Sequence, residues 1–229
     1  MLTEMTQVAT HSIRTRPRAA GVLPMVLALG VLVLSGNIVP AQSAAAASKS
    51  GSEGAVSAEA AESAAGKLQQ ILDVSRGAGA LVRFTEAEVN SYLFYELASR
   101  YPRGVSKINV RFTPGHLQGT CEVDFEKLRA ARRSPGGMMD YLFFGVHTLA
   151  VEGGFSAVGG TGQFDLQTVE LDGVPLPRML VDFLIDTYLR PRFPTLALDS
   201  PFRMPYSIDR VQVGRASIEV EAKPPAAIY

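Results

Sequence analysis

Residues 107–126 read KINVRFTPGHLQGTCEVDFE, and this stretch decides the fold class. Apolar and polar residues alternate on both sides of the Pro114-Gly115 pair. Such alternation predicts strands with one face in the core and one in water, and the Pro-Gly pair predicts the turn between them. The stretch therefore predicts an antiparallel hairpin. Its apolar positions are Ile108, Val110, Phe112, Leu117, Cys121, Val123 and Phe125.

Two further hairpins are predicted downstream. One covers 149–171 and turns at Gly159-Gly160, and the other covers 211–222 and turns near Gly214. In the first, the alternation slips by one residue near Gln167–Val169, which predicts a bulge that bends the sheet. Several antiparallel hairpins with few helices indicate an α+β fold.

Two helices complete this prediction. Phe84–Pro102 reads FTEAEVNSYLFYELASRYP, in which Thr85 and Glu88 form a capping box at the start of an amphipathic helix. Pro175–Arg190 is apolar around most of its circumference, so we expect it to be buried on most sides. A curved antiparallel sheet of hairpins wrapped around this long helix would bury it. The polar residues of the helix form one stripe: Arg178, Asp182, Asp186 and Arg190.

The N-terminus carries the pattern of an export signal. Arginines precede an apolar run at Ala19–Leu34, and Ala41-Gln42-Ser43 supplies small residues for cleavage. The alternative is an uncleaved anchor, although a membrane-spanning helix needs about 20 apolar residues. Residues 1–43 are thus predicted to be a signal peptide or an N-terminal membrane anchor. The folded part is expected to be extracytoplasmic, either periplasmic or secreted.

The remaining chain divides into three parts. Residues 44–66 are rich in Ala, Ser, Gly and Glu and have few large apolar side chains, so we expect a linker. Ala and Glu also favour a helix near the end of that linker. Residues 67–222 are expected to form a single α+β domain, and residues 223–229 a short tail.

Composition excludes several classes of function. Lys+Arg and Asp+Glu both total 22, so the balanced charge argues against a nucleic-acid partner. The single cysteine, Cys121, leaves no internal disulfide and is interpreted as a small buried apolar residue. The three histidines lack metal-ligand spacing, and no nucleophile or phosphate-binding motif is present. We therefore expect no enzyme, no metal and no cofactor.

A basic cluster followed directly by an apolar run lies between residues 127 and 144. This combination suits contact with an anionic membrane surface, with cations at the headgroups and aromatic rings inserted. The alternative is a solvated helix end, a loop and then a core segment. The candidates for membrane contact are Arg129, Arg132, Arg133, Tyr141, Phe143 and Phe144.

Three quoted stretches occur in a familiar order. They are FTEAEVNSYL at Phe84–Leu93, VELDGVPLPRMLVDFL at Val169–Leu184 and PFRMPYSIDRVQVGRASIEV at Pro201–Val220. The most specific part is GVPLP at residues 173–177, which enters the second helix. This pattern resembles YpmS-like and LmeA-like envelope proteins, which are related to the tubular lipid-binding superfamily. The resemblance implies a strongly curved sheet that wraps a long helix beside an apolar groove, and it implies no catalytic residues.

The sequence thus predicts an exported, non-enzymatic domain that binds a lipid or another apolar ligand in the cell envelope. The alternative is a structural or protein-interaction domain of the envelope, with a fully packed core and no ligand. An open apolar interior and a filled one give the same sequence pattern. Protein partners are not specified by the sequence. The candidates to line a groove are Leu93, Leu97, Leu180, Phe183 and Leu184.

Overall fold

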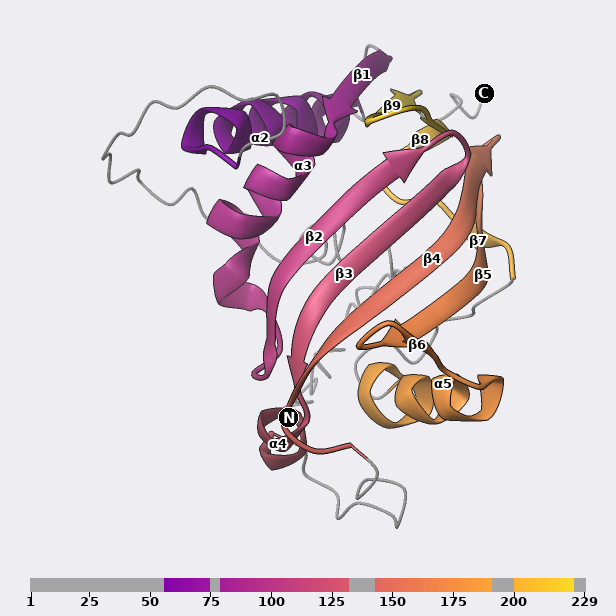
Figure 1. Ribbon diagram of the computed structural model, residues 1–229. Helices are drawn as coiled ribbons and strands as arrows, with labels where there is room; N and C mark the ends of the chain where they lie inside the picture. The colour runs from indigo at the N-terminus through magenta and orange to yellow at the C-terminus, as the bar shows by residue number, and fades with distance from the viewer. Residues whose placement is uncertain (1–55, 75–78, 132–142, 191–199, 225–229) are drawn as a thin grey trace, which may run out of the picture.

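The computed structural model describes residues 56–74, 79–131, 143–190 and 200–224. An antiparallel, curved sheet and a few helices make up the described part, so the predicted α+β class is confirmed (Figure 1). The expected signal peptide or anchor, residues 1–43, lies outside the described residues. Within the described ranges, no helix has the length and apolarity needed to cross a membrane.

The helices and strands have the following bounds. The helices are α2 (Ala58–Asp73), α3 (Glu86–Tyr92), α4 (Phe125–Ala130) and α5 (Arg178–Leu184), with π-helical turns at Leu93–Leu97 and Ile185–Leu189 and a 3-10 turn at Ala98–Arg100. The strands are β1 (Ala80–Thr85), β2 (Val105–Thr113), β3 (His116–Asp124), β4 (Val146–Val158), β5 (Thr161–Leu171), β6 (Val174–Pro175), β7 (Phe202–Arg203), β8 (Ile208–Val213) and β9 (Ser217–Ala222).

The three predicted hairpins are confirmed as β2–β3, β4–β5 and β8–β9. The strand order is β1-β9-β8-β4-β3-β2, with β5 on the other side of β4. Along one edge of β4, residues 146–154 pair with β3, and the last pair is His116 with Gly154. Further along the same edge, Ala157 of β4 pairs with Val211 of β8. The sheet therefore continues past the tip of the β2–β3 hairpin, where the Gly115 N–H donates to the Val213 carbonyl at 3.0 Å.

The predicted slip in the alternation corresponds to a bulge between β4 and β5. Gly153 faces Leu166 and Glu152 faces Thr168, so Gln167 is an extra residue on β5. An extra residue on one strand bends the pair and increases its local twist. The bulge keeps Phe164 and Val169 on the same buried face in spite of their odd spacing.

α3 closes the free edge of β2. The Asn90 side-chain amide donates to the Val110 carbonyl at 2.8 Å and accepts from the Val110 N–H at 2.7 Å. The Phe112 N–H donates to a Glu86 carboxylate oxygen at 2.6 Å. These side chains satisfy backbone groups that an edge strand would otherwise offer to another chain.

The second predicted helix, which corresponds to α5 and the π-helical turn after it, is less buried than expected. α5 and the π-helical turn after it bury only Val181 and Ile185, while Met179 is 69% exposed. Figure 1 shows α5 beside β6, at one end of the β4–β5 pair. Burial on most sides was overpredicted, because an apolar helix surface does not specify which element will cover it.

The first described helix begins before residue 67, and the last strand, β9, ends at Ala222, where the domain was expected to end. α2 begins at Ala58, inside the 44–66 segment where we expected a linker with helix near its end. Ala61 and Ala64 are each 1% exposed, because small side chains let α2 approach its neighbours closely. At the other end, the Lys223 N–H donates to the Ser207 carbonyl at 2.9 Å.

The bulge generates a prediction about Gly153. A Cβ atom there would lie 2.5 Å from the Asp165 carbonyl oxygen and 2.5 Å from Cζ of Phe164. We expect Gly153→Ala to lower the free energy of unfolding by about 1–3 kcal/mol, measured by urea denaturation. Gly154→Ala is the matched control, because its nearest neighbour would be 3.8 Å away. Equal stability of the two variants would contradict this account.

Candidate functional site

The structure separates the predicted groove residues into two groups. Leu93 and Leu97 are 0% and 1% exposed and belong to the main cluster of apolar residues on the inner face of the sheet. Leu180, Phe183 and Leu184 are partly buried and belong to a second cluster, called here the end cluster. The buried members of the end cluster are Cys121, Val123, Phe125, Leu128 and Phe143.

A gap lies where these two clusters meet. Ile108 and Leu149 pack against both of them. Gly119 of β3 is buried on the same face, between Val110 of β2 and Val151 of β4. No heavy atom of the described residues lies within 4 Å of the position that a Gly119 Cβ would take. This position, called here the Gly119 gap, has room for a methyl group on the inner face of the sheet, among apolar side chains.

The end cluster is built around stacked aromatic rings. The ring centroids of Phe143 and Phe125 are 5.0 Å apart, and the two rings are inclined at 26°. The centroids of Phe143 and Phe183 are 6.4 Å apart, at an angle of 11°. Tyr188 lies 6.0 Å from Phe125 in an edge-on arrangement. Phe143 therefore connects α4 with α5, and Phe183 joins the stack from the exposed side.

Phe143 and Phe144, two of the membrane-contact candidates, differ in exposure. Phe143 is 5% exposed, so it is a core residue rather than a residue available for insertion. Phe144 is 53% exposed, and the Arg129 guanidinium lies 5.3 Å from the centroid of its ring. Successive residues of an extended segment point to opposite sides, so only one of the two phenylalanines faces out. The other three candidates, Arg132, Arg133 and Tyr141, lie outside the described residues.

The outer face of the sheet is polar. A shallow depression of about 30 Å³ lies between β3, β4 and β5, beside Glu152, Thr168 and Glu170. This volume is enough for about one water molecule. It does not suit an apolar ligand.

A histidine–carboxylate pair joins β4 to the β5–β6 turn, and sequence reasoning did not find it. His147 Nδ1 lies 2.6 Å from Asp172 Oδ2, and His147 Nε2 contacts the Phe144 carbonyl. The hydrogen bond with Asp172 raises the pKa of His147, and the same bond lowers the pKa of Asp172. The sequence contains Asp172-Gly173, a pair that favours a two-residue hairpin turn, and both residues have positive φ in the structure.

Neither this pair nor the cysteine has the arrangement of a catalytic base or nucleophile. The outer nitrogen of His147 faces a carbonyl, so it has no hydroxyl or thiol to deprotonate. Burial raises the pKa of the Cys121 thiol to about 11, which leaves it protonated and unreactive. Among the described residues, no group of three or more His, Cys, Asp or Glu side chains is placed to hold a metal ion.

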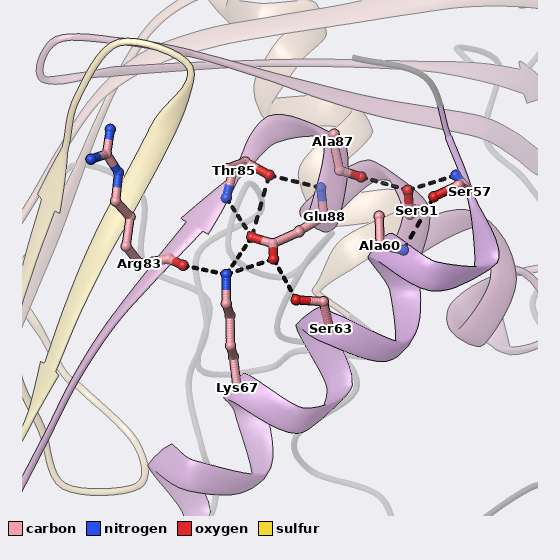
Figure 2. A network of polar contacts seen from close by, with 9 residues as sticks. All are labelled: Ser57, Ala60, Ser63, Lys67, Arg83, Thr85, Ala87, Glu88 and Ser91. Carbon is pink, nitrogen blue, oxygen red and sulfur yellow. Dashed lines mark hydrogen bonds and ion pairs between the residues drawn. The ribbon is translucent and has the colours of Figure 1, made fainter. Parts of the chain in front are cut away.

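A network of polar contacts lies between α2, β1 and α3 (Figure 2). The predicted capping box is present: the Glu88 N–H donates to Thr85 Oγ1 at 3.2 Å, and the Thr85 N–H donates to Glu88 Oε2 at 2.9 Å. Ser63 donates to Glu88 Oε1 at 2.6 Å, and Lys67 Nζ lies 2.5 Å from the same oxygen. Lys67 also donates to the Arg83 carbonyl at 2.8 Å.

The contacts of this network join α2, β1 and α3. The Ser63 hydroxyl donates a hydrogen bond to the Glu88 carboxylate, and the Lys67 ammonium donates to the same group. Burial by itself raises the pKa of Glu88, but the hydrogen bonds from Lys67, Ser63 and the Thr85 backbone together lower it. The ionised carboxylate thus holds three segments together.

Comparison with known proteins gives no match to a protein-family model, to a curated protein or to a solved structure. Function therefore has to be inferred from the residues and their geometry.

Removal of Lys67 tests the network. We expect Lys67→Met to lower the free energy of unfolding by about 2 kcal/mol, because Glu88 keeps its charge but loses its ionic donor. Lys107→Met is the matched control, since Lys107 also pairs with a glutamate at 2.6 Å but is 73% exposed. We expect this variant to lose less than about 0.5 kcal/mol in the same denaturation experiment. A similar loss in both variants would show that burial does not strengthen the Lys67 pair.

Proposed function

We propose that this chain is an exported, non-enzymatic domain that binds a lipid or another apolar ligand in the cell envelope. The observation that carries this proposal is the Gly119 gap. Protein interiors are close-packed, and voids that can hold a ligand are few. The space at Gly119 lies among apolar side chains, so the group that it favours is apolar, such as part of an acyl chain.

Three of the five groove candidates support this choice. Leu180, Phe183 and Leu184 belong to the end cluster, whereas Leu93 and Leu97 are fully packed in the main cluster. The three residues of the end cluster are only partly buried, so the end of the sheet near α5 is the side from which a ligand would enter. The resemblance to the tubular lipid-binding superfamily, in which a curved sheet and a helix enclose an apolar groove, agrees with this interpretation.

Export forms part of the proposal. The apolar run at residues 19–34, the preceding arginines and the single cysteine agree with a domain that folds outside the cytoplasm without disulfides. If the segment stays uncleaved, it holds the domain within reach of the bilayer. Lipid would then be the nearest apolar ligand.

A second candidate function is an interaction domain of the envelope with a filled core. Leu93 and Leu97 favour it, because exposures of 0% and 1% leave no water-sized space against either side chain. Phe94 and Tyr95 also favour it, because they are 61% and 50% exposed. Their rings lie edge to face at 5.0 Å, and aromatic residues are enriched in protein interfaces.

Filling the gap distinguishes the two candidates. We expect Gly119→Leu to weaken the uptake of a fluorescent fatty acid at least about tenfold, because the new side chain occupies the proposed ligand space. The free space around the Cβ position admits a methyl group, so Gly119→Ala should keep the fold, and the folding of Gly119→Leu is checked by circular dichroism. Gly154→Leu places the same side chain on the outer face of the sheet and should bind as the wild type does.

Native mass spectrometry of the purified chain gives an independent readout. We expect a co-purifying lipid in the wild type and in Gly154→Leu, and its loss in Gly119→Leu. Neither lipid nor fatty-acid uptake in the wild type would overturn the proposal in favour of the filled core. Unchanged uptake in Gly119→Leu would show that the gap is not the binding site.

A further inference from the structure

Three consecutive carbonyls between Phe143 and Gly145 are each held by a donor from elsewhere. The Phe143 carbonyl accepts from Arg129 Nη2 at 2.8 Å, and the Gly145 carbonyl accepts from the Phe125 N–H at 3.0 Å. The middle carbonyl, of Phe144, faces Nε2 of His147. Of these donors, only a histidine changes its charge near neutral pH.

The two nitrogens of His147 face different acceptors. Nδ1 faces the Asp172 carboxylate, which is itself fixed by the Thr148 N–H at 2.7 Å, and Nε2 faces the Phe144 carbonyl. A neutral imidazole has one N–H and one lone pair, and a carbonyl cannot donate. Only the protonated ring can therefore satisfy both contacts. When the ring loses a proton, the remaining N–H stays on Nδ1, where it donates to the Asp172 carboxylate. The lone pair of Nε2 then faces the Phe144 carbonyl oxygen and repels it.

Charged and titratable groups reach this region from several elements. Asp172 of the β5–β6 turn is the carboxylate in contact with the ring. Asp124 at the end of β3 is paired with Lys127 of α4 at 2.8 Å, and Arg129 of α4 is bound to the Phe143 carbonyl. Tyr188 contacts Phe125, whose ring lies 5.8 Å from the ring of His147. Asp172 is thus the group that stabilises the positive charge on His147.

We propose that His147 is a pH-sensitive latch on the apolar site. The imidazolium holds the Phe143–Gly145 segment in place, and its deprotonation releases the Phe144 carbonyl and loosens Phe143 over the end cluster. The effect on ligand access rests on the proposed function, because Phe143 stacks on the groove candidate Phe183. The effect on the segment itself does not depend on any ligand.

The direction of the pH dependence follows from His147. Its pKa is raised above the ordinary value of 6.5 by the hydrogen bond with Asp172. The stabilisation by the latch is therefore fully present below about 6.5 and is lost as pH rises through the folded-state pKa. The segment is held tightly in acid and loosely above the folded-state pKa of His147, where access to the end cluster increases.

Hydrogen exchange measured by mass spectrometry tests the latch on the full-length chain. After correction for the intrinsic exchange rate, we expect the opening of residues 143–149 to rise about tenfold or more between about pH 5.5 and about pH 8.5. His147→Gln should remove this dependence, because glutamine does not titrate. His116→Gln, at the other described histidine, should retain it. Flat exchange in the wild type, or an unchanged pH dependence in His147→Gln, would overturn the proposal.

Asp172→Asn provides a second variant that keeps the turn, because asparagine tolerates positive φ. Loss of the carboxylate should move the midpoint of opening to lower pH, and an unmoved midpoint would contradict the pairing. Uptake of Nile red, which is uncharged over this range, tests ligand access. We expect faster uptake at the higher pH in the wild type and equal rates in His147→Gln. Opening that depends on pH without any Nile red uptake would support the latch and overturn the proposed function.

Discussion

The Glu88 carboxylate is the constraint on which the arrangement of the other elements depends. It accepts hydrogen bonds from Ser63 and Lys67 of α2 and from the backbone of Thr85 at the end of β1. These contacts fix where α3 begins and how it lies against its neighbours. Asn90, one turn later, then meets the edge of β2, and Leu93 is directed into the main cluster. A single ionised group thus connects the start of the folded region to the inner face of the sheet.

Sequence reasoning succeeded where the information is local. Period-two alternation and glycine turns defined the three hairpins, and the bulge at Gln167 followed from one slip in that alternation. The Thr85–Glu88 capping box spans only four residues, so its geometry is set by the helix itself. The limited burial of α5 was not predictable, because its apolar surface does not identify the element that covers it.

The candidate site was only partly accessible to the same reasoning. The sequence identified apolar residues on two helices, but their division into two clusters depends on how the sheet bends. The contact between His147 and Asp172 depends on the pairing of β4 with β5, which brings together residues 25 positions apart. The space beside Gly119 results from a side chain that is missing and from neighbours that do not fill it, and neither is written in a local pattern. The candidate site therefore depends on which residues the strand pairing brings together, rather than on a local sequence motif.

The cap that Asn90 places on β2 also affects how this protein ages and assembles. The amide contributes both a donor and an acceptor to Val110, and an aspartate formed there by deamidation would keep only the acceptor. The Val110 carbonyl would then face a carboxylate instead of an N–H group. An uncapped edge strand is a template for pairing with other chains and for fibril growth. One side-chain nitrogen therefore helps to protect the folded domain against aggregation.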